Sequence, residues 1–144
     1  MSPELRFETI TEASHAIVGP AGALFNKVFS PPPDIFLGDD YKLYVATHGL
    51  QLVGAANVCD GLFDDLAYIH KIAVDPAYRN QGVGSALLRY TLDDLCIAGK
   101  PKAAICPSND DNKRLYERLG FVQDPSLANV SEWLFKDLSQ HDKA

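Results

Sequence analysis

The chain has 144 residues, 47% of them hydrophobic, which is enough apolar material for one ordinary core. Nineteen acidic residues outnumber thirteen basic ones, and the formal net charge of −6 argues against a nucleic-acid partner. No run of apolar residues approaches the length of about eighteen that a membrane span needs. The first residues also lack the basic and apolar regions of a signal peptide. We therefore expect a single domain over residues 1–144, located in the cytoplasm, with no membrane partner.

The N-terminal half is expected to form one helix and a set of strands. The helix covers about Pro20–Phe29, where four large apolar residues share one face, and Pro31-Pro32-Pro33 stop it. Runs of β-forming residues bounded by turn residues predict strands over Leu5–Ile10, Tyr41–Thr47, Gln51–Cys59 and Leu66–Val74. Short, turn-prone segments join the last three strands, so we expect these strands to pair antiparallel.

Helices and strands alternate in the C-terminal half. Three leucines at helical spacing predict a helix over Ser85–Ala98, which Gly99 ends. A shorter helix is expected to begin after Ser108 or Asn109, either of which can cap it, and to end at Gly120. The strands expected here are Lys102–Cys106, Phe121–Val122 and Glu132–Leu138. This order of elements predicts a mixed α/β fold.

The segment Arg79-Asn80-Gln81-Gly82-Val83-Gly84 leads from a strand into a helix and has the features of a phosphate-binding loop. Gly82 and Gly84 allow a ligand to approach the backbone closely, and the first N–H groups of the helix have no partner within it. Arg79 adds a planar cation that matches phosphate oxygens. The segment predicts an anion site, and the alternative for the loop taken alone is an ordinary tight turn with glycine at positive φ.

Two other kinds of phosphate loop do not fit the sequence. A dinucleotide-binding Gly-x-Gly-x-x-Gly motif would need Gly or Ala where Leu87 stands, and the acidic residue that binds ribose is missing about twenty residues further on. A P-loop would need Gly-Lys followed by Ser or Thr, and the chain contains no such triplet. Neither dinucleotide binding nor P-loop chemistry is therefore predicted.

A second motif follows at residues 109–121, where Asn109 is followed seven residues later by Tyr116 and then by Leu119-Gly120-Phe121. Together with Arg79-x-x-Gly82-x-Gly84, it resembles the GNAT acetyltransferase superfamily. The resemblance implies a mostly antiparallel central sheet flanked by helices, acetyl-CoA as the cofactor, and an N-acetyltransferase that transfers the acetyl group to a primary amine of a small molecule or peptide. It also allows a homodimer.

The resemblance further implies which residues hold acetyl-CoA. Backbone groups of the strand before the loop would pair with the pantetheine as an added strand does, and the loop amides would bind the pyrophosphate. The cofactor-binding residues expected in this way are Ile72, Ala73, Val74, Arg79, Asn80, Gln81, Gly82, Val83, Gly84, Ser85, Asn109, Asn112 and Tyr116.

Two residues are candidates for acid and base catalysis. His70 lies on the strand before the loop, where many members of the family carry a glutamate base, and a histidine pKa near ~6.5 suits a base at neutral pH. The resemblance places the hydroxyl of Tyr116 beside the coenzyme A sulfur, where it would protonate or hydrogen-bond the leaving thiolate. A packing role is the alternative for each: His70 alternates with apolar strand residues, and Tyr116 could cover the sheet.

Cysteines and histidines add no further chemistry. Cys59, Cys96 and Cys106 form no Cys-x-x-Cys pair and are expected to be buried or half-buried thiols, so neither an acyl-cysteine intermediate nor a disulfide framework is predicted. The four histidines show no metal-ligand spacing, and no metal is expected. A catalytically idle acyl-CoA binding or sensing domain is the alternative function. The acceptor is left open among polyamines, amino acids, aminoglycosides and protein termini.

Overall fold

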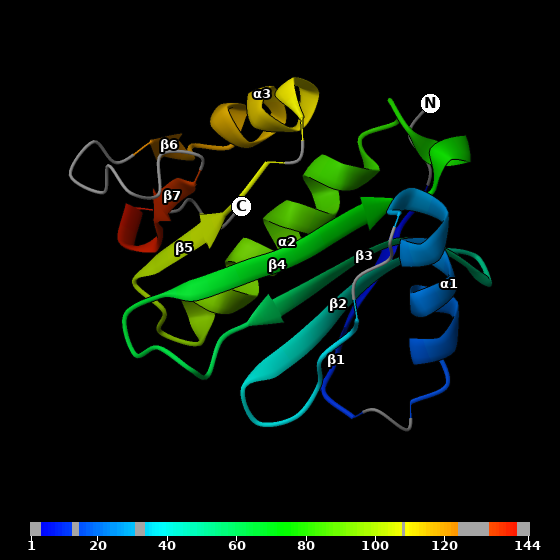
Figure 1. Cartoon of the computed structure of the whole chain (residues 1–144), viewed down its shortest axis with the longest axis horizontal. Helices are drawn as coiled ribbons and strands as arrows, with labels where there is room; N and C mark the ends of the chain where they lie inside the picture. The colour runs from blue at the N-terminus through cyan, green and yellow to red at the C-terminus, as the bar shows by residue number, and fades with distance from the viewer. Residues whose placement is uncertain (1–3, 13–14, 31–33, 108, 124–132, 141–144) are drawn as a thin grey trace.

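The computed structural model describes residues 4–12, 15–30, 34–107, 109–123 and 133–140, which form one seven-stranded sheet with helices on both faces (Figure 1). The strands are β1 (Arg6–Ile10), β2 (Tyr41–His48), β3 (Gln51–Cys59), β4 (Ala67–Val74), β5 (Lys102–Ile105), β6 (Val122–Gln123) and β7 (Leu134–Asp137). The helices are α1 (Val18–Val28), α2 (Val83–Ile97) and α3 (Asp110–Arg118), with short 3-10 helices η1 (Pro76–Tyr78) and η3 (Leu138–Gln140).

The strand order is β1-β2-β3-β4-β5-β7-β6. Neighbouring strands are antiparallel except β4 and β5, which are parallel and joined through α2. The mixed, mostly antiparallel sheet predicted from the sequence is thus confirmed. Among the described helices, none has the length and apolar character needed to cross a membrane.

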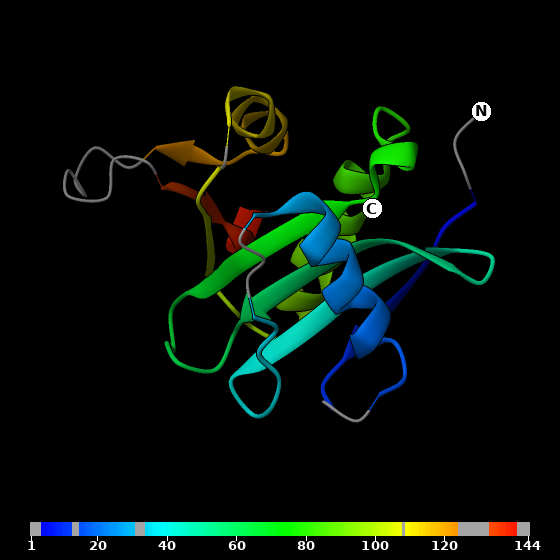
Figure 2. The same cartoon turned by 45° about the vertical axis from the view of Figure 1, so that its right-hand side comes forward.

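Two apolar cores lie on opposite faces of this sheet (Figures 1 and 2). Alternation along β2 separates them: Leu43 and Val45 pack with Phe25 of α1, whereas Tyr44 and Ala46 pack with the leucines of α2. β2 and β3 are therefore covered on both faces, as the nearly continuous burial of their residues shows. Because both faces of the sheet are covered, α1 lies on one side of β4 and the N-terminal end of α2 lies on the other.

Element boundaries differ from the predicted ones in small ways that have local causes. The second helix begins at Val83 and not at Ser85, because Gly82 takes the left-handed conformation that caps it. Phe121 is not in a strand; it is a fully buried core residue, and β6 starts one position later. β7 is confirmed over Leu134–Asp137, and the predicted first residue of that strand, Glu132, lies outside the described residues.

β4 carries an irregularity that the sequence did not reveal. Ile69 lies opposite Val58 of β3 and Lys71 lies opposite Asn57, so His70 is an extra residue that forms a β-bulge. On its other side β4 pairs with β5 only as far as Ile69, opposite Ile105, where β5 ends, and in both views the chain after β5 leads away from β4 toward α3 (Figures 1 and 2). Within the described chain, the edge of β4 from His70 to Val74 therefore has no strand beside it.

Candidate functional site

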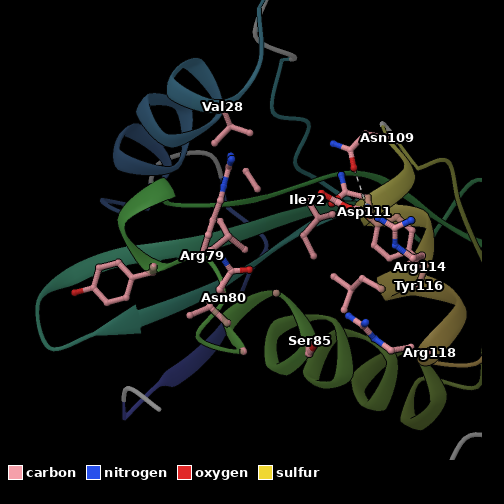
Figure 3. A pocket seen from close by; sticks show the side chains of 18 of the residues that line it. Val28, Ile72, Arg79, Asn80, Ser85, Asn109, Asp111, Arg114, Tyr116 and Arg118 are labelled. Atoms are coloured by element: carbon pink, nitrogen blue, oxygen red, sulfur yellow. Dashed lines mark hydrogen bonds and ion pairs between the residues drawn. The ribbon is translucent and has the colours of Figure 1, made fainter. Parts of the chain in front are cut away.

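A groove of about 960 Å³ lies beside the unpaired part of β4 (Figure 3). Its walls come from the C-terminal end of α1, the last residues of β4, the loop after η1, the first turn of α2, and α3. Of the residues predicted to bind the cofactor, all but Gln81 line it: Ile72, Ala73, Val74, Arg79, Asn80, Gly82, Val83, Gly84, Ser85, Asn109, Asn112 and Tyr116. The Gln81 side chain instead donates a hydrogen bond to the Ala77 carbonyl at 3.2 Å.

The loop that enters the groove is shaped by Asp75 and by two left-handed residues. The Asp75 carboxylate accepts a hydrogen bond from the Ala77 N–H at 3.0 Å and so caps η1. Asn80 (φ 64°) and Gly82 (φ 81°) then adopt positive φ, which glycine tolerates freely and asparagine better than most residues. These turns bring the chain back to the N-terminus of α2.

The N-terminus of α2 opens directly into the groove. Its cap residue, Gly82, offers no side-chain hydrogen bond, and the helix makes its first backbone bond from the Ala86 N–H to the Gly82 carbonyl at 3.0 Å. The N–H groups of Val83, Gly84 and Ser85 therefore precede the first intrahelical donor, and all three residues line the groove. Such a helix end attracts anions through these N–H groups and its dipole.

Three arginines surround the same space (Figure 3). Arg79 reaches in from the loop, and Arg114 and Arg118, one helical turn apart, lie on α3. Asp111 also lines the groove and forms an ion pair with Arg114. The net charge of the chain is negative, yet this groove concentrates cations and a helix N-terminus, which suits a ligand with several phosphates.

Sequence reasoning identified Arg79 but missed Arg114 and Arg118. Their spacing of four on a short amphipathic helix was the available signal, since it places both on one helix face. Tyr78 and the end of α1, represented by Phe29, were also missed as groove residues. No local pattern marks them, because only the fold brings α1 beside the loop.

Tyr116 lies on the inner side of α3 and lines the groove, although only 3% of its surface is exposed. Its ring packs against Phe121 with centroids 6.2 Å apart. Burial, with a smaller contribution from the Cys106 thiol, raises the pKa of Tyr116 well above its usual value of 10.0. The phenol therefore keeps its proton at neutral pH and can act as a hydrogen-bond donor.

Asn109 caps α3: its side-chain oxygen accepts a hydrogen bond from the Asn112 N–H at 2.8 Å. The predicted capping role is confirmed. Asp110 and Asp111 follow in the first turn, where acidic residues complement the helix dipole. The cap fixes where α3 starts and therefore where Tyr116 meets the groove.

His70 is placed differently from Tyr116, because it does not line the groove. It is half-buried on the face of β4 that α1 covers, with its ring centroid 5.7 Å from that of Phe36 and 5.8 Å from that of Tyr68. Burial, and secondarily the Lys71 ammonium, lower the pKa of His70 below 6.5. At neutral pH the imidazole is therefore uncharged and able to accept a proton.

The three thiols differ in exposure. Cys59 is buried and Cys96 is half-buried, as expected, whereas Cys106 is exposed because it follows the last paired residue of β5. Within the described ranges, no three side chains of histidine, cysteine, aspartate or glutamate come together as a metal site.

Comparison with known proteins relates this chain to a family. Residues 39–123, which run from the start of β2 to the end of β6, match the model of the acetyltransferase (GNAT) domain. The N-alpha-acetyltransferase RimI of Mycobacterium tuberculosis is 34% identical over 101 residues. That match covers 69% of this chain and 59% of the relative, so the chain spans about three fifths of the relative's length.

Solved structures share the fold. The ribosomal-protein-S18-alanine N-acetyltransferase from Escherichia coli superposes with a TM-score of 0.70 at 22% identity, covering 96% of this chain and 97% of that one. The N-acetylglutamate synthase from Neisseria gonorrhoeae, solved with coenzyme A and N-acetyl-glutamate, gives a TM-score of 0.71 at 16% identity over 96% of this chain and 36% of that one. Sequence match and fold agree, and the chain belongs to the GNAT acetyltransferase family.

Proposed function

We propose that this chain, acting as one domain over residues 1–144, transfers the acetyl group of acetyl-CoA to a primary amine. The observation that carries the proposal is the groove in which the open N-terminus of α2 and three arginines meet the unpaired edge of β4. The first two features suit the phosphates of coenzyme A. The strand edge suits the two amides of pantetheine, which can pair with backbone groups as an added strand does.

In the proposed reaction the amine nitrogen attacks the thioester carbonyl, a C–N bond forms and the C–S bond breaks. The amine loses one proton and the departing thiolate gains one. Tyr116 would donate a hydrogen bond to that sulfur. Its raised pKa makes complete proton transfer more uphill than from an ordinary tyrosine, so stabilisation of the developing charge is its main contribution.

His70 is the proposed base, either directly or through water. For an α-amine with a pKa near 7.7–8.0, deprotonation at pH 7 costs about 1.0–1.4 kcal/mol, whereas a lysine-like amine with a pKa near 10.4 costs about 4.6 kcal/mol. A base whose pKa lies below 6.5 is better matched to the first kind of acceptor. We therefore propose the α-amine of a peptide or protein as the first acceptor to test, a choice that the RimI relative also supports.

One observation favours a second candidate, an acyl-CoA binding domain without turnover. His70 lies outside the groove, on the face of β4 that α1 covers, so the predicted base is not held beside Tyr116 by any direct contact. If water does not connect the two sides of β4, the groove would bind acetyl-CoA and leave the amine protonated.

Two measurements test the proposal. Calorimetry with coenzyme A tests the groove, and we expect binding that weakens as salt is added, because phosphate contacts are screened. Thiol release from acetyl-CoA is then followed with a panel of peptides that have free or blocked N-termini, and with lysine side-chain and polyamine acceptors. Release only with free α-amines supports the proposal in full. Binding without release from any amine supports the second candidate, and absence of binding rejects both.

A further inference from the structure

Asn57 of β3 is a completely buried amide whose hydrogen-bonding groups are all used. The Phe36 N–H donates to its side-chain oxygen at 2.8 Å, and its side-chain NH₂ donates to the carbonyl oxygens of Phe36 at 2.8 Å and of Lys42 at 2.9 Å. A buried amide is costly unless its groups are paired, so this complete pairing indicates a specific role for an asparagine in a strand whose other buried residues are apolar.

The partner of Asn57 is an irregular stretch of chain in which Ile35 and Leu37 pack against the apolar core on the α1 side of the sheet. Residues 34–37 precede an isolated bridge at Gly38 and belong to no helix or strand. By bonding both the N–H and the C=O of Phe36, the Asn57 side chain does for this residue what a neighbouring strand would do. Together with the packing of Ile35 and Leu37, these hydrogen bonds attach the connection between α1 and β2 to the sheet at Phe36.

That point lies beside the bulge of β4. Asn57 is paired with Lys71, immediately next to the extra residue His70. The Phe36 ring meets the His70 ring edge-on, with ring centroids 5.7 Å apart. Its centroid lies 5.2 Å from that of the Tyr41 ring. The amide, the phenylalanine and the imidazole therefore form one continuous chain of contacts.

We propose that Asn57 is a positioning residue for the acceptor side of the reaction: it holds Phe36 against His70 and so fixes the orientation and the enclosure of the proposed base. This inference rests on the proposed function, because it assigns His70 to the amine. It adds a residue that touches neither the groove nor the reacting atoms, since Asn57 is enclosed within the sheet.

Other groups near His70 could also affect its titration. On β4 these groups are Tyr68 and Lys71. The Tyr68 ring contacts the His70 ring. Lys71 faces the same side of the strand because of the bulge, and its ammonium lies 5.2 Å from the centroid of the Phe29 ring. The ring of Tyr41 of β2 packs against that of Phe36, and Cys59 of β3 lies close to both tyrosines. Lys71 is the charged group among these, and the variants below leave it in place.

Two variants should weaken the contact between Phe36 and His70 in different ways. Asn57→Leu keeps the size and burial of the side chain but removes all three hydrogen bonds. Phe36→Ala keeps those bonds, which involve only the backbones of residues 36 and 42, and removes the ring. Because Phe36 is 42% exposed, the second variant should fold even if the first does not. Tyr44→Phe is the control, since it removes a buried hydrogen bond to Asp94 on the opposite face of the sheet.

The test combines NMR titration of His70 with steady-state kinetics. We expect the pKa of His70 to rise toward 6.5 in Asn57→Leu and Phe36→Ala but not in Tyr44→Phe, because the ring gains water. We also expect kcat/KM for the amine to fall at least ~5-fold with the KM for acetyl-CoA unchanged, as misplacement of a reacting group predicts. An unchanged His70 titration in folded Asn57→Leu, or in Phe36→Ala if the first variant does not fold, overturns the inference. An equal shift of the His70 pKa in the Tyr44→Phe control also overturns the inference.

These outcomes are separate from those that decide the proposed function. The His70 titration needs neither cofactor nor acceptor, so it reports on Asn57 even if the wild-type chain releases no thiol with any amine. If the titration shifts as expected and the wild type is inactive, the positioning role stands and the proposed reaction fails.

Discussion

Asp75 and Lys27 join the loop of the groove to α1, with the carboxylate oxygen and the ammonium nitrogen 3.3 Å apart. The same carboxylate caps η1, so one side chain sets both the turn of the loop and its attachment to the neighbouring helix. The hydrogen bond from the Ala77 N–H lowers the pKa of Asp75, burial works against this, and Lys27 lowers the pKa further.

Asp75 variants should separate the cap from the ion pair. Asp75→Ala loses both and should destabilise the fold by about 1–2 kcal/mol, whereas Asp75→Asn keeps an acceptor for the Ala77 N–H and should lose less, about 0.5–1 kcal/mol. Urea unfolding at pH 7 measures both, with Lys27→Ala as the control for the ion pair alone. Equal losses in Asp75→Ala and Lys27→Ala would show that the cap contributes nothing.

The stability that Asp75 provides should also depend on pH. Its pKa is depressed in the folded chain, so its contribution is complete above the ordinary carboxyl pKa of about 3.9 and is lost as the pH falls through the lower folded value. The difference in unfolding free energy between wild type and Asp75→Asn should therefore shrink as the pH is lowered below about 4. A difference that stays constant down to pH 2 would contradict the assignment.

Gly82 and Gly84 should respond to alanine in opposite ways. Alanine at Gly82 would have to adopt φ near +81° and should cost about 1–2 kcal/mol. Alanine at Gly84 sits in the helix, where its Cβ would make ordinary contacts of 3.4 Å with Val74 and 3.6 Å with Leu115, and should gain about 0.5–1 kcal/mol. Thermal unfolding measures the melting temperatures of the two variants. A melting temperature below that of the wild type in both would refute the expected opposite effects.

Arg118 should contribute to coenzyme A affinity although no sequence motif marks it. Arg118→Gln is expected to weaken binding by about 3- to 10-fold, an effect that decreases with added salt. Arg89→Gln, an exposed change on α2 outside the groove, serves as the matched charge control. Calorimetry measures both variants, and equal losses would mean that only the overall charge matters.

Tyr116→Phe should separate turnover from binding. The ring and its contact with Phe121 are kept, so coenzyme A affinity and stability should stay near the wild-type values, whereas kcat should fall by about 10- to 100-fold. Because the pKa of Tyr116 is raised above 10.0, the wild-type rate should not decline through its ionisation up to about pH 10. Full turnover in the phenylalanine variant would remove Tyr116 from the mechanism.

His70→Gln tests the base. The lowered pKa of His70 predicts that the acidic limb of kcat/KM for the amine lies below pH 6.5, because only the neutral imidazole accepts a proton. Substitution should remove that limb and lower kcat. A pH profile with the same acidic limb in the variant would show that another group takes the proton.

The parts of the site that depend on nearby residues could be predicted from the sequence. Asn109 marks the start of α3 through capping, which involves only a few consecutive residues, whereas the start of α2 was predicted two residues late, at Ser85 in place of Val83. The strands of the sheet were predicted for a similar reason, since β-forming runs are local. These signals placed nearly all expected cofactor residues around one groove.

What the sequence did not reveal depends on pairing between distant segments. The bulge at His70 arises from the registers of β3 and β4, and periodicity along one strand cannot show it. For the same reason His70 and Tyr116 were expected to act together, whereas the structure puts them in different surroundings. The role of Asn57 depends on Phe36, twenty-one positions away, with which it shares no local pattern.

The unpaired edge of β4 has a consequence for how long the chain survives in a cell. A ligand that pairs with the edge of β4 would act as an eighth strand, so its binding energy would also resist unfolding. At a concentration one hundred times its dissociation constant, such a ligand adds about 2.7 kcal/mol. If acetyl-CoA is that ligand, as proposed, proteases that cleave transiently opened chains would degrade this protein fastest when acetyl-CoA is scarce, so that its abundance would follow the supply of acetyl-CoA.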